Sequence, residues 1–180
     1  RCHDDIGLGF DDSDIILAGY EPYEHRKFLI DYYTGYFGNS HARGLPFGHN
    51  EKNGDARISG SLASLVGLQY ALEAGDPLAT DEAIKNILLL HSMILSFGGI
   101  PLLYYGDELG ELNDFSYQDD PHKAGDSRWI HRPTIDWQRA ENRNVSGTVE
   151  YNIFSALKRM IAVRKEIGVF SDFNNRELFE

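Results

Sequence analysis

Apolar positions in the middle of the chain recur at helical spacing. Between residues 80 and 97 they stand three or four positions apart, together with one histidine: Ile84, Ile87, Leu88, His91, Ile94 and Leu95. An α-helix has 3.6 residues per turn, so this spacing places them on one face. Gly98 and Gly99 follow and are typical of a helix end. The pattern therefore predicts a helix over residues 80–97 that buries one face.

The same reasoning predicts three further helices, over residues 23–36, 62–74 and 149–167. Pro22 precedes the first, and proline is well suited to the first turn of a helix. Ser59 is a candidate cap for the second, and each of the three is followed by glycine. Helices therefore dominate the predicted structure between residues 23 and 167.

Strands are predicted at only two places, and each is followed by a long loop. Residues 1–5 have the character of a strand's C-terminal tip, and residues 100–105 form an apolar run that leads into Gly106-Asp107-Glu108. Residues 39–57 are polar and contain turn signals, so we expect a loop there. Residues 106–147 are rich in Asp, Asn and His, and a loop of that length within a domain is usually functional.

This order of elements suits the last part of an α/β fold, the (β/α)8 TIM barrel, in which function lies in loops after strand C-termini. Two strands do not close a barrel, so we expect residues 1–180 to form a C-terminal fragment of a catalytic barrel. A long helical insertion would follow the penultimate strand, and residues 6–58 would form its inserted loop lobe. Residues 59–168 would supply the last helices, the last strand and its long loop. The barrel face left open should expose apolar surface, through which the chain could self-associate.

Composition disfavours some classes of partner. The 180 residues include 28 acidic and 17 basic side chains, and the formal net charge is −11. Nucleic-acid binders usually carry clustered Lys and Arg, and anionic membrane surfaces attract the same residues, so neither partner is expected. The longest apolar run, around residues 84–95, is too short to span a bilayer. The charge balance fits an enzyme with a neutral substrate, among other classes.

Cysteine and histidine give no sign of a metal or cofactor. Cys2 is the single cysteine, which excludes an internal disulfide and a Cys-based zinc site, and we expect it to be a small core residue. His41, His49, His122 and His131 are scattered without metal-ligand spacing, so we expect them to face solvent. One cysteine is compatible with a reducing cytoplasm but does not require it, so a secreted protein stays possible.

Three motifs carry the candidate chemistry: RCHDD at residues 1–5, GDARISG at residues 54–60 and DSRW at residues 126–129. GIPLLYYGDE at residues 99–108 and HRP at residues 131–133 accompany them. Together they resemble the alpha-amylase superfamily, glycoside hydrolase family 13, and within it the branch that uses sucrose. The resemblance runs along nearly the whole chain, and the combination of the three motifs is its most specific part.

The resemblance implies a retaining mechanism, in which one carboxylate attacks the anomeric carbon and a carboxylic acid protonates the leaving oxygen. Asp4 matches a third carboxylate that stabilises the oxocarbenium-like state, and His3 would donate a hydrogen bond to a glucosyl hydroxyl. No segment matches the nucleophile or the acid/base, so we expect both upstream of Arg1 and the isolated chain to be inactive. Glu108 is interpreted as structural.

The remaining site residues also follow from the resemblance. Asp5 and Arg57 would line the fructosyl side of the cleft, and Arg128 would close the base of the glucosyl pocket through an ion pair. Read from the residues alone, a lone Arg after a turn is more often in a surface ion pair, which for Arg57 would be with Asp55 or Glu51. Arg128 could pair with Asp126, Asp4 or solvent and merely stabilise its loop, and the His3–Asp4 pair could tie a strand end to its neighbours.

The resemblance thus implies an enzyme that splits sucrose, releases fructose and passes glucose to an alpha-glucan or to water. A sucrose hydrolase or alpha-glucosidase of the same superfamily is the alternative among enzymes. The alternative from another class is a non-catalytic fragment that keeps sugar contacts but has no nucleophile.

Overall fold

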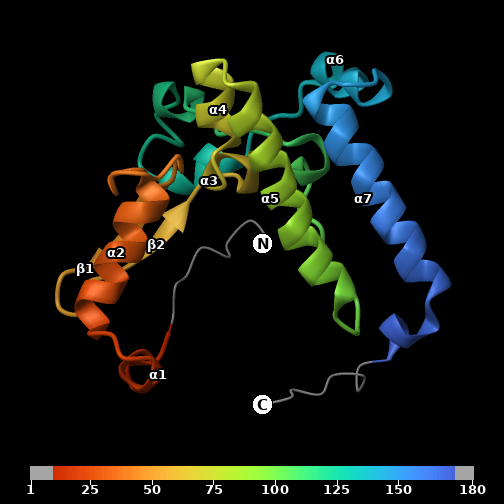
Figure 1. Cartoon of the computed structure of the whole chain (residues 1–180). Helices are drawn as coiled ribbons and strands as arrows, with labels where there is room; N and C mark the ends of the chain where they lie inside the picture. Colours follow the sequence, from red (N-terminus) through yellow and green to blue (C-terminus); the bar gives the residue numbers. More distant parts are fainter. Residues whose placement is uncertain (1–9, 173–180) are drawn as a thin grey trace.

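The computed structural model describes residues 10–172, and most of their regular structure is helical (Figure 1). In chain order the helices and strands are α1 (Asp12–Leu17), α2 (Pro22–Thr34), β1 (Leu45–Asn50), β2 (Asp55–Ser59), α3 (Leu62–Leu65), α4 (Leu68–Ala74), α5 (Pro77–Ser96), α6 (Trp137–Ala140) and α7 (Val149–Glu166). Short 3-10 helices interrupt the connections: η1 (Asp107–Leu109), η2 (Ser116–Asp119), η3 (Ser127–His131), η4 (Glu141–Asn144) and η5 (Gly168–Ser171).

The helices predicted from periodicity are confirmed, with local corrections. Helix α5 begins three residues earlier than predicted, because the Asp76 side chain accepts hydrogen bonds from the first free N–H groups of the helix. The helix predicted over residues 62–74 is divided into α3 and α4 at Gly67, where φ is +95°. The loop lobe expected over residues 6–58 contains a short helix in its described part, α1, which Asp11 caps.

The hydrophobic core lies where α4, α5 and α7 meet. Leu68, Ile87 and Ile153 are each at most 1% exposed and belong to one cluster of buried side chains. Helices α5 and α7 run side by side in the same direction (Figure 1). Complete burial of such a side chain contributes about 1.5–3 kcal/mol, so this helix pair anchors the long connection between its members.

The polar segment over residues 39–57 is not simply a loop, because it contains an antiparallel hairpin. Strand β1 pairs with β2, with Phe47 opposite Arg57. Ala56 and Ile58 are buried, and β2 packs against α2. Strand β1 contains Pro46 and Gly48, two residue types that are uncommon in strands. Its composition therefore did not predict a strand.

The prediction of a strand over residues 100–105 is wrong, because the described structure has no strand there. The described residues also do not show a barrel. The two strands found in residues 10–172 form a single hairpin, and residues 100–103 are extended but belong to no sheet. A strand needs a neighbour to share its backbone hydrogen bonds, and no described strand lies beside this segment. The described chain is a mostly helical unit with a hairpin, which is compatible with a fragment of an alpha-amylase-type domain.

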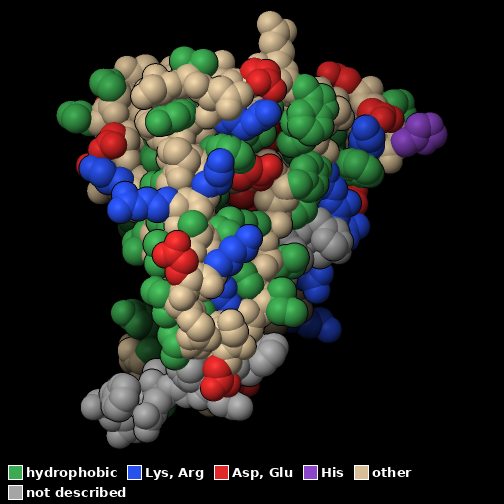
Figure 2. All heavy atoms as spheres, turned by 90° about the vertical axis from the view of Figure 1, so that its right-hand side faces the viewer, with side chains coloured by type: hydrophobic (Ala, Val, Ile, Leu, Met, Phe, Trp, Pro, Cys, Tyr) green, Lys and Arg blue, Asp and Glu red, His purple; other side chains and the backbone are tan. Residues whose placement is uncertain are grey.

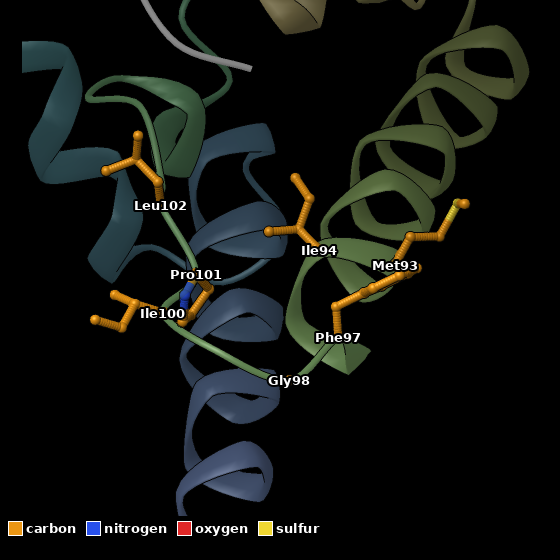
Figure 3. A pocket seen from close by; sticks show the side chains of 7 residues that line it. All are labelled: Met93, Ile94, Phe97, Gly98, Ile100, Pro101 and Leu102. Carbon is orange, nitrogen blue, oxygen red and sulfur yellow. The ribbon is translucent and has the colours of Figure 1, made fainter. Parts of the chain in front are cut away.

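This unpaired segment borders the apolar surface that the sequence led us to expect. A pocket of about 410 Å³ opens between the end of α5 and the extended chain (Figure 3), lined by Met93, Ile94, Phe97, Gly98, Ile100, Pro101 and Leu102. Ile100 is 90% exposed and Leu102 is 67% exposed. The view from the α7 side also shows apolar side chains exposed among charged ones (Figure 2).

Arg164 of α7 holds the chain that leads from α5 into this segment. Its guanidinium donates hydrogen bonds to the carbonyl oxygens of Leu95, Phe97 and Gly99. Carbonyls at a helix C-terminus lack partners within the helix, so this arginine takes the place of a glycine-based cap. Within residues 10–172, no helix has the length and apolar character needed to cross a bilayer.

We expect Gly110→Ala to destabilise the fold by about 2–4 kcal/mol, because left-handed backbone strain and overpacking add. Gly110 has φ +64°, and an added Cβ would lie 2.6 Å from Cδ1 of Ile153. Gly147 has φ +90° with nothing within 4 Å of the added atom, so Gly147→Ala should cost only about 1–2 kcal/mol. Urea denaturation measures both, and equal losses would contradict the packing role of Gly110.

Candidate functional site

The hairpin places Arg57 and Phe47 on one face. Residues directly opposite each other in an antiparallel pair project to the same side of the sheet. Phe47 and Arg57 are such a pair, and neighbouring Ala56 and Ile58 therefore point to the other side, where they are buried. Phe47 is half-buried and Arg57 is exposed. Arg57 thus stands at the open edge of a face that carries an aromatic ring.

Helix η3 packs against that same face. The hydroxyl oxygens of Ser59 and Ser127 lie 3.4 Å apart, and the guanidinium carbon of Arg128 lies 5.0 Å from the centre of the Phe47 ring. This is the geometry of a cation–π contact. The structure therefore brings Arg128, which is far from Arg57 in the sequence, to the face of the hairpin on which Phe47 and Arg57 are paired.

The Asp126 carboxylate binds one edge of the Arg128 guanidinium. Nε of Arg128 donates to Oδ1 at 2.9 Å and Nη2 donates to Oδ2 at 2.8 Å, a two-point contact between a planar cation and a carboxylate. Oδ1 also accepts the backbone N–H of Arg128 and so caps η3. Among the partners considered from the sequence, Asp126 is therefore one that Arg128 contacts.

His131 joins three parts of the site and is not the solvent-facing residue we expected. It is 1% exposed, and its Nδ1 accepts the backbone N–H of Gly60 at 3.3 Å. Its carbonyl oxygen accepts a hydrogen bond from the Tyr104 hydroxyl at 3.2 Å. The end of the hairpin, η3 and the extended segment before η1 meet here. The other three loop histidines are exposed, as expected: His41, His49 and His122.

The carboxylates that follow the extended segment have structural contacts. Glu108 accepts the backbone N–H of Gly106 at 2.8 Å, which caps the turn locally and agrees with the structural interpretation of this residue. Asp107 is buried, and its Oδ2 lies 3.9 Å from Nε2 of His91 on α5. Burial lowers the pKa of His91, which favours the neutral ring.

A second polar network attaches the long loop to α7. Arg139 contacts Glu111 at 3.0 Å and Glu150 at 2.8 Å. Burial raises the pKa of Glu111, although the Arg139 charge opposes that shift. These three side chains hold the loop to α7, and no motif in the sequence singled them out.

The structure describes some of the expected site residues and not others. Arg57 and Arg128 are described: Arg57 is the cross-strand partner of Phe47, and the Arg128 guanidinium lies over the Phe47 ring. His3, Asp4 and Asp5, together with Cys2, lie outside the described residues. In the described part of the chain, no ion pair joins Arg57 to Asp55 or Glu51. Residues 10–172 also contain no cluster of three or more His, Cys, Asp or Glu side chains arranged to hold a metal ion.

Comparisons with known proteins give a distant, partial relation to the alpha-amylase family of sugar-active enzymes. Over 96 residues the chain is 28% identical to glucosylglycerate phosphorylase of Escherichia coli strain K12. The match covers 53% of this chain but 17% of that enzyme, so the chain corresponds to a small part of the relative. No protein-family model matches the chain.

We expect the Asp126 carboxyl to titrate below its ordinary pKa of 3.8, chiefly because the Arg128 side chain donates hydrogen bonds to it. Since the pKa is lower in the folded than in the unfolded chain, the pair stabilises the fold above about pH 4. This stability is lost as the pH falls through the lowered, folded-state value. An NMR titration of the carboxyl carbon should show the low midpoint, and Arg128→Met should raise it.

Arg143→Met is the matched control, because Arg143 pairs with Glu141 and not with Asp126. An Asp126 midpoint that stays the same in Arg128→Met would contradict the two-point contact.

Proposed function

We propose that the chain forms part of the sugar-binding cleft of a retaining, alpha-amylase-type enzyme, and that sucrose is the glucosyl donor. The observation that carries this proposal is that Arg128 lies over the ring of Phe47, the cross-strand partner of Arg57, in a chain related at a distance to a sugar-active enzyme. The motifs of the chain resemble those of amylosucrase. The enzyme would release fructose and pass glucose to an alpha-glucan or to water.

Arginine suits recognition of a neutral sugar because its guanidinium presents several fixed donors to neighbouring hydroxyl groups. In this proposal Arg128 closes the base of the glucosyl pocket, and its contact with Asp126 fixes the direction of its donors. Arg57, exposed at the edge of the hairpin, binds the fructosyl side together with Asp5. The lobe that carries the hairpin would then narrow the cleft over the leaving group.

The covalent chemistry would combine this chain with the rest of a longer protein. A carboxylate nucleophile forms a bond to the anomeric carbon while an acid protonates the departing fructosyl oxygen, and an acceptor hydroxyl then displaces the enzyme. Asp4 would be the third carboxylate, which stabilises the positively charged state between these steps more than the neutral sugar. His3 would donate to a glucosyl hydroxyl.

A second candidate is a phosphorylase, favoured by the similarity to glucosylglycerate phosphorylase. In that reaction inorganic phosphate, rather than a sugar or water, accepts the glucosyl group. Both candidates use the same glucosyl pocket, so Arg128 has the same role in each. They differ in the leaving group and in the need for phosphate.

The longer protein that contains this chain should release fructose from sucrose without added phosphate. Asp4→Asn should lower kcat by about 100- to 1,000-fold, because a preorganised charge is lost. Arg128→Met should lower kcat/KM by about 10- to 100-fold, as expected for lost charged hydrogen bonds. Arg143→Met, which removes an exposed ion pair, should leave turnover unchanged.

Turnover of glucosylglycerate that requires phosphate, without turnover of sucrose, would replace the first candidate by the second. Normal sucrose turnover in Asp4→Asn and Arg128→Met would contradict the proposed roles of both residues.

The 180-residue chain alone should release no fructose from sucrose, with or without Asp4→Asn, because no motif in it matches a nucleophile. A sensitive fructose assay on the purified chain makes this measurement. Release that disappears in Asp4→Asn would mean that the chain holds a complete catalytic set, with Glu108 as the first residue to test.

A further inference from the structure

We propose that the groove between the C-terminal halves of α5 and α7 binds a small molecule with an apolar body and one anionic group. A medium-chain fatty acid has this chemistry. Apolar side chains of the groove hold the body, and Arg159 of α7 binds the anion. Among the residues that the structure describes, none from the hairpin or η3 lines this groove, so the site is independent of the function proposed above.

The walls of the groove are mostly apolar. Leu95 of α5, Met160 and Val163 of α7, and Phe170 of η5 line it, and its volume is about 360 Å³. Pockets of roughly 300–1,000 Å³ with apolar walls and few polar groups are typical of small-ligand sites. Leu95 is buried, whereas Val163 is 45% exposed. A ligand in the groove would therefore remove apolar surface from water, which favours binding.

Most polar groups of these walls already have partners inside the protein. The hydroxyl groups of Ser92 and Ser96 donate to carbonyl oxygens one turn earlier in α5, at 2.7 and 2.8 Å. The Arg164 guanidinium donates to carbonyl oxygens at the end of α5 and in η5. These donors are satisfied, so they give a ligand little to bind.

Arg159 differs from them. Its side chain is exposed and lines the groove, yet across residues 10–172 it takes part in no hydrogen bond or ion pair. A guanidinium keeps its charge and presents five N–H donors in a plane, which suits a carboxylate. Although the chain has 28 acidic residues, no described Asp or Glu lines the groove. The protein thus supplies the cation and leaves the anion to the ligand.

The sequence around Arg159 is also positively charged, in a chain whose formal net charge is −11. Residues 158–166 contain four basic side chains and one acidic side chain: Lys158, Arg159, Arg164, Lys165 and Glu166. Figure 2, which views the molecule from the α7 side, shows Lys and Arg side chains beside apolar ones. Clustered charge raises the local concentration of oppositely charged ligands. The groove therefore favours an anion over a neutral molecule with the same body.

The pocket at the end of α5 provides a comparison within the same molecule. It is larger, at about 410 Å³, and no charged residue of the described chain lines it. Its lining includes Met93, whereas Met160 lines the groove, and the sequence contains these two methionines only. Each of the two apolar sites therefore has one methionine methyl group of its own, which reports binding at that site.

The test is NMR of the 180-residue chain with ¹³C-labelled methionine methyl groups, titrated with octanoate. We expect the Met160 signal to shift with a Kd of about 1–10 mM, the scale for a ligand of few atoms, and the Met93 signal to stay in place. Hexanoate, with two methylene groups fewer, should bind about tenfold more weakly. 1-Octanol keeps the apolar body without the charge and should bind about threefold to fivefold more weakly than octanoate.

Arg159→Gln should weaken octanoate binding about threefold to fivefold and leave 1-octanol binding unchanged, because it removes the cation and keeps a polar side chain. Lys158→Gln is the matched control, since it removes the same charge from a neighbouring residue that does not line the groove. It should change the octanoate affinity by less than about twofold. Ala156→Leu narrows the groove and should weaken the binding of both ligands. Circular dichroism verifies that each variant is folded.

A Met160 signal that does not move, or octanoate that binds no better than 1-octanol, would overturn the proposal without any variant. Equal weakening by Arg159→Gln and Lys158→Gln would also overturn it, because the effect would then be one of overall charge. A Met160 shift that follows protein concentration rather than octanoate, with a dimer that Ala156→Leu dissociates in sedimentation experiments, would assign the groove to a second copy of the chain instead.

Discussion

The packing of α5 against α7 is the constraint on which the rest of the molecule depends. Ile87 and Ile153 are almost completely buried in the core that α5 and α7 form. The whole connection from residue 97 to residue 148 begins at the end of α5 and ends at the start of α7. This connection buries some apolar side chains of its own, among them Leu109 and Ile130. It is held by polar contacts to the helices, notably the Arg139 network and the carbonyl contacts of Arg164. The candidate site is therefore a loop-borne site on a helical support, an arrangement common in proteins that bind small molecules.

Within that connection, buried polar atoms contribute to the order of the site beside the apolar packing of Ile130. His131 connects the hairpin, η3 and Tyr104 through hydrogen bonds in a location with almost no solvent. A hydrogen bond there costs more to lose than one at the surface, because the abandoned group has no water to replace its partner. The hairpin and η3 are consequently well positioned relative to each other, although each is short.

The long helices could be predicted from sequence because their apolar spacing is itself the physical cause of their burial. The hairpin could not, since β1 includes Pro46 and Gly48 and its stability comes from pairing with β2. The segment over residues 100–105 shows the opposite case, in which a strand-like composition lacks a partner. The motifs identified Arg57 and Arg128 as candidates, but their placement on one face of the hairpin depends on strand register and on the packing of η3. Nothing in the sequence distinguished Phe47 from the other nine phenylalanines.

The bulge in the hairpin, where β1 has one residue more than β2 between Phe47 and Asn50, has a consequence for how this lobe could diverge among related proteins. Side chains alternate between the two faces of a strand, so a shift in pairing by one residue would turn Arg57 toward α2 and Ala56 toward η3. Substitutions on the η3-facing side change the surface presented to a ligand and keep the pairing intact. Changes in strand length would exchange the two faces altogether. Diversification of ligand choice in this lobe is therefore expected through point substitution on one face, with length variation confined to the turn beyond the bulge.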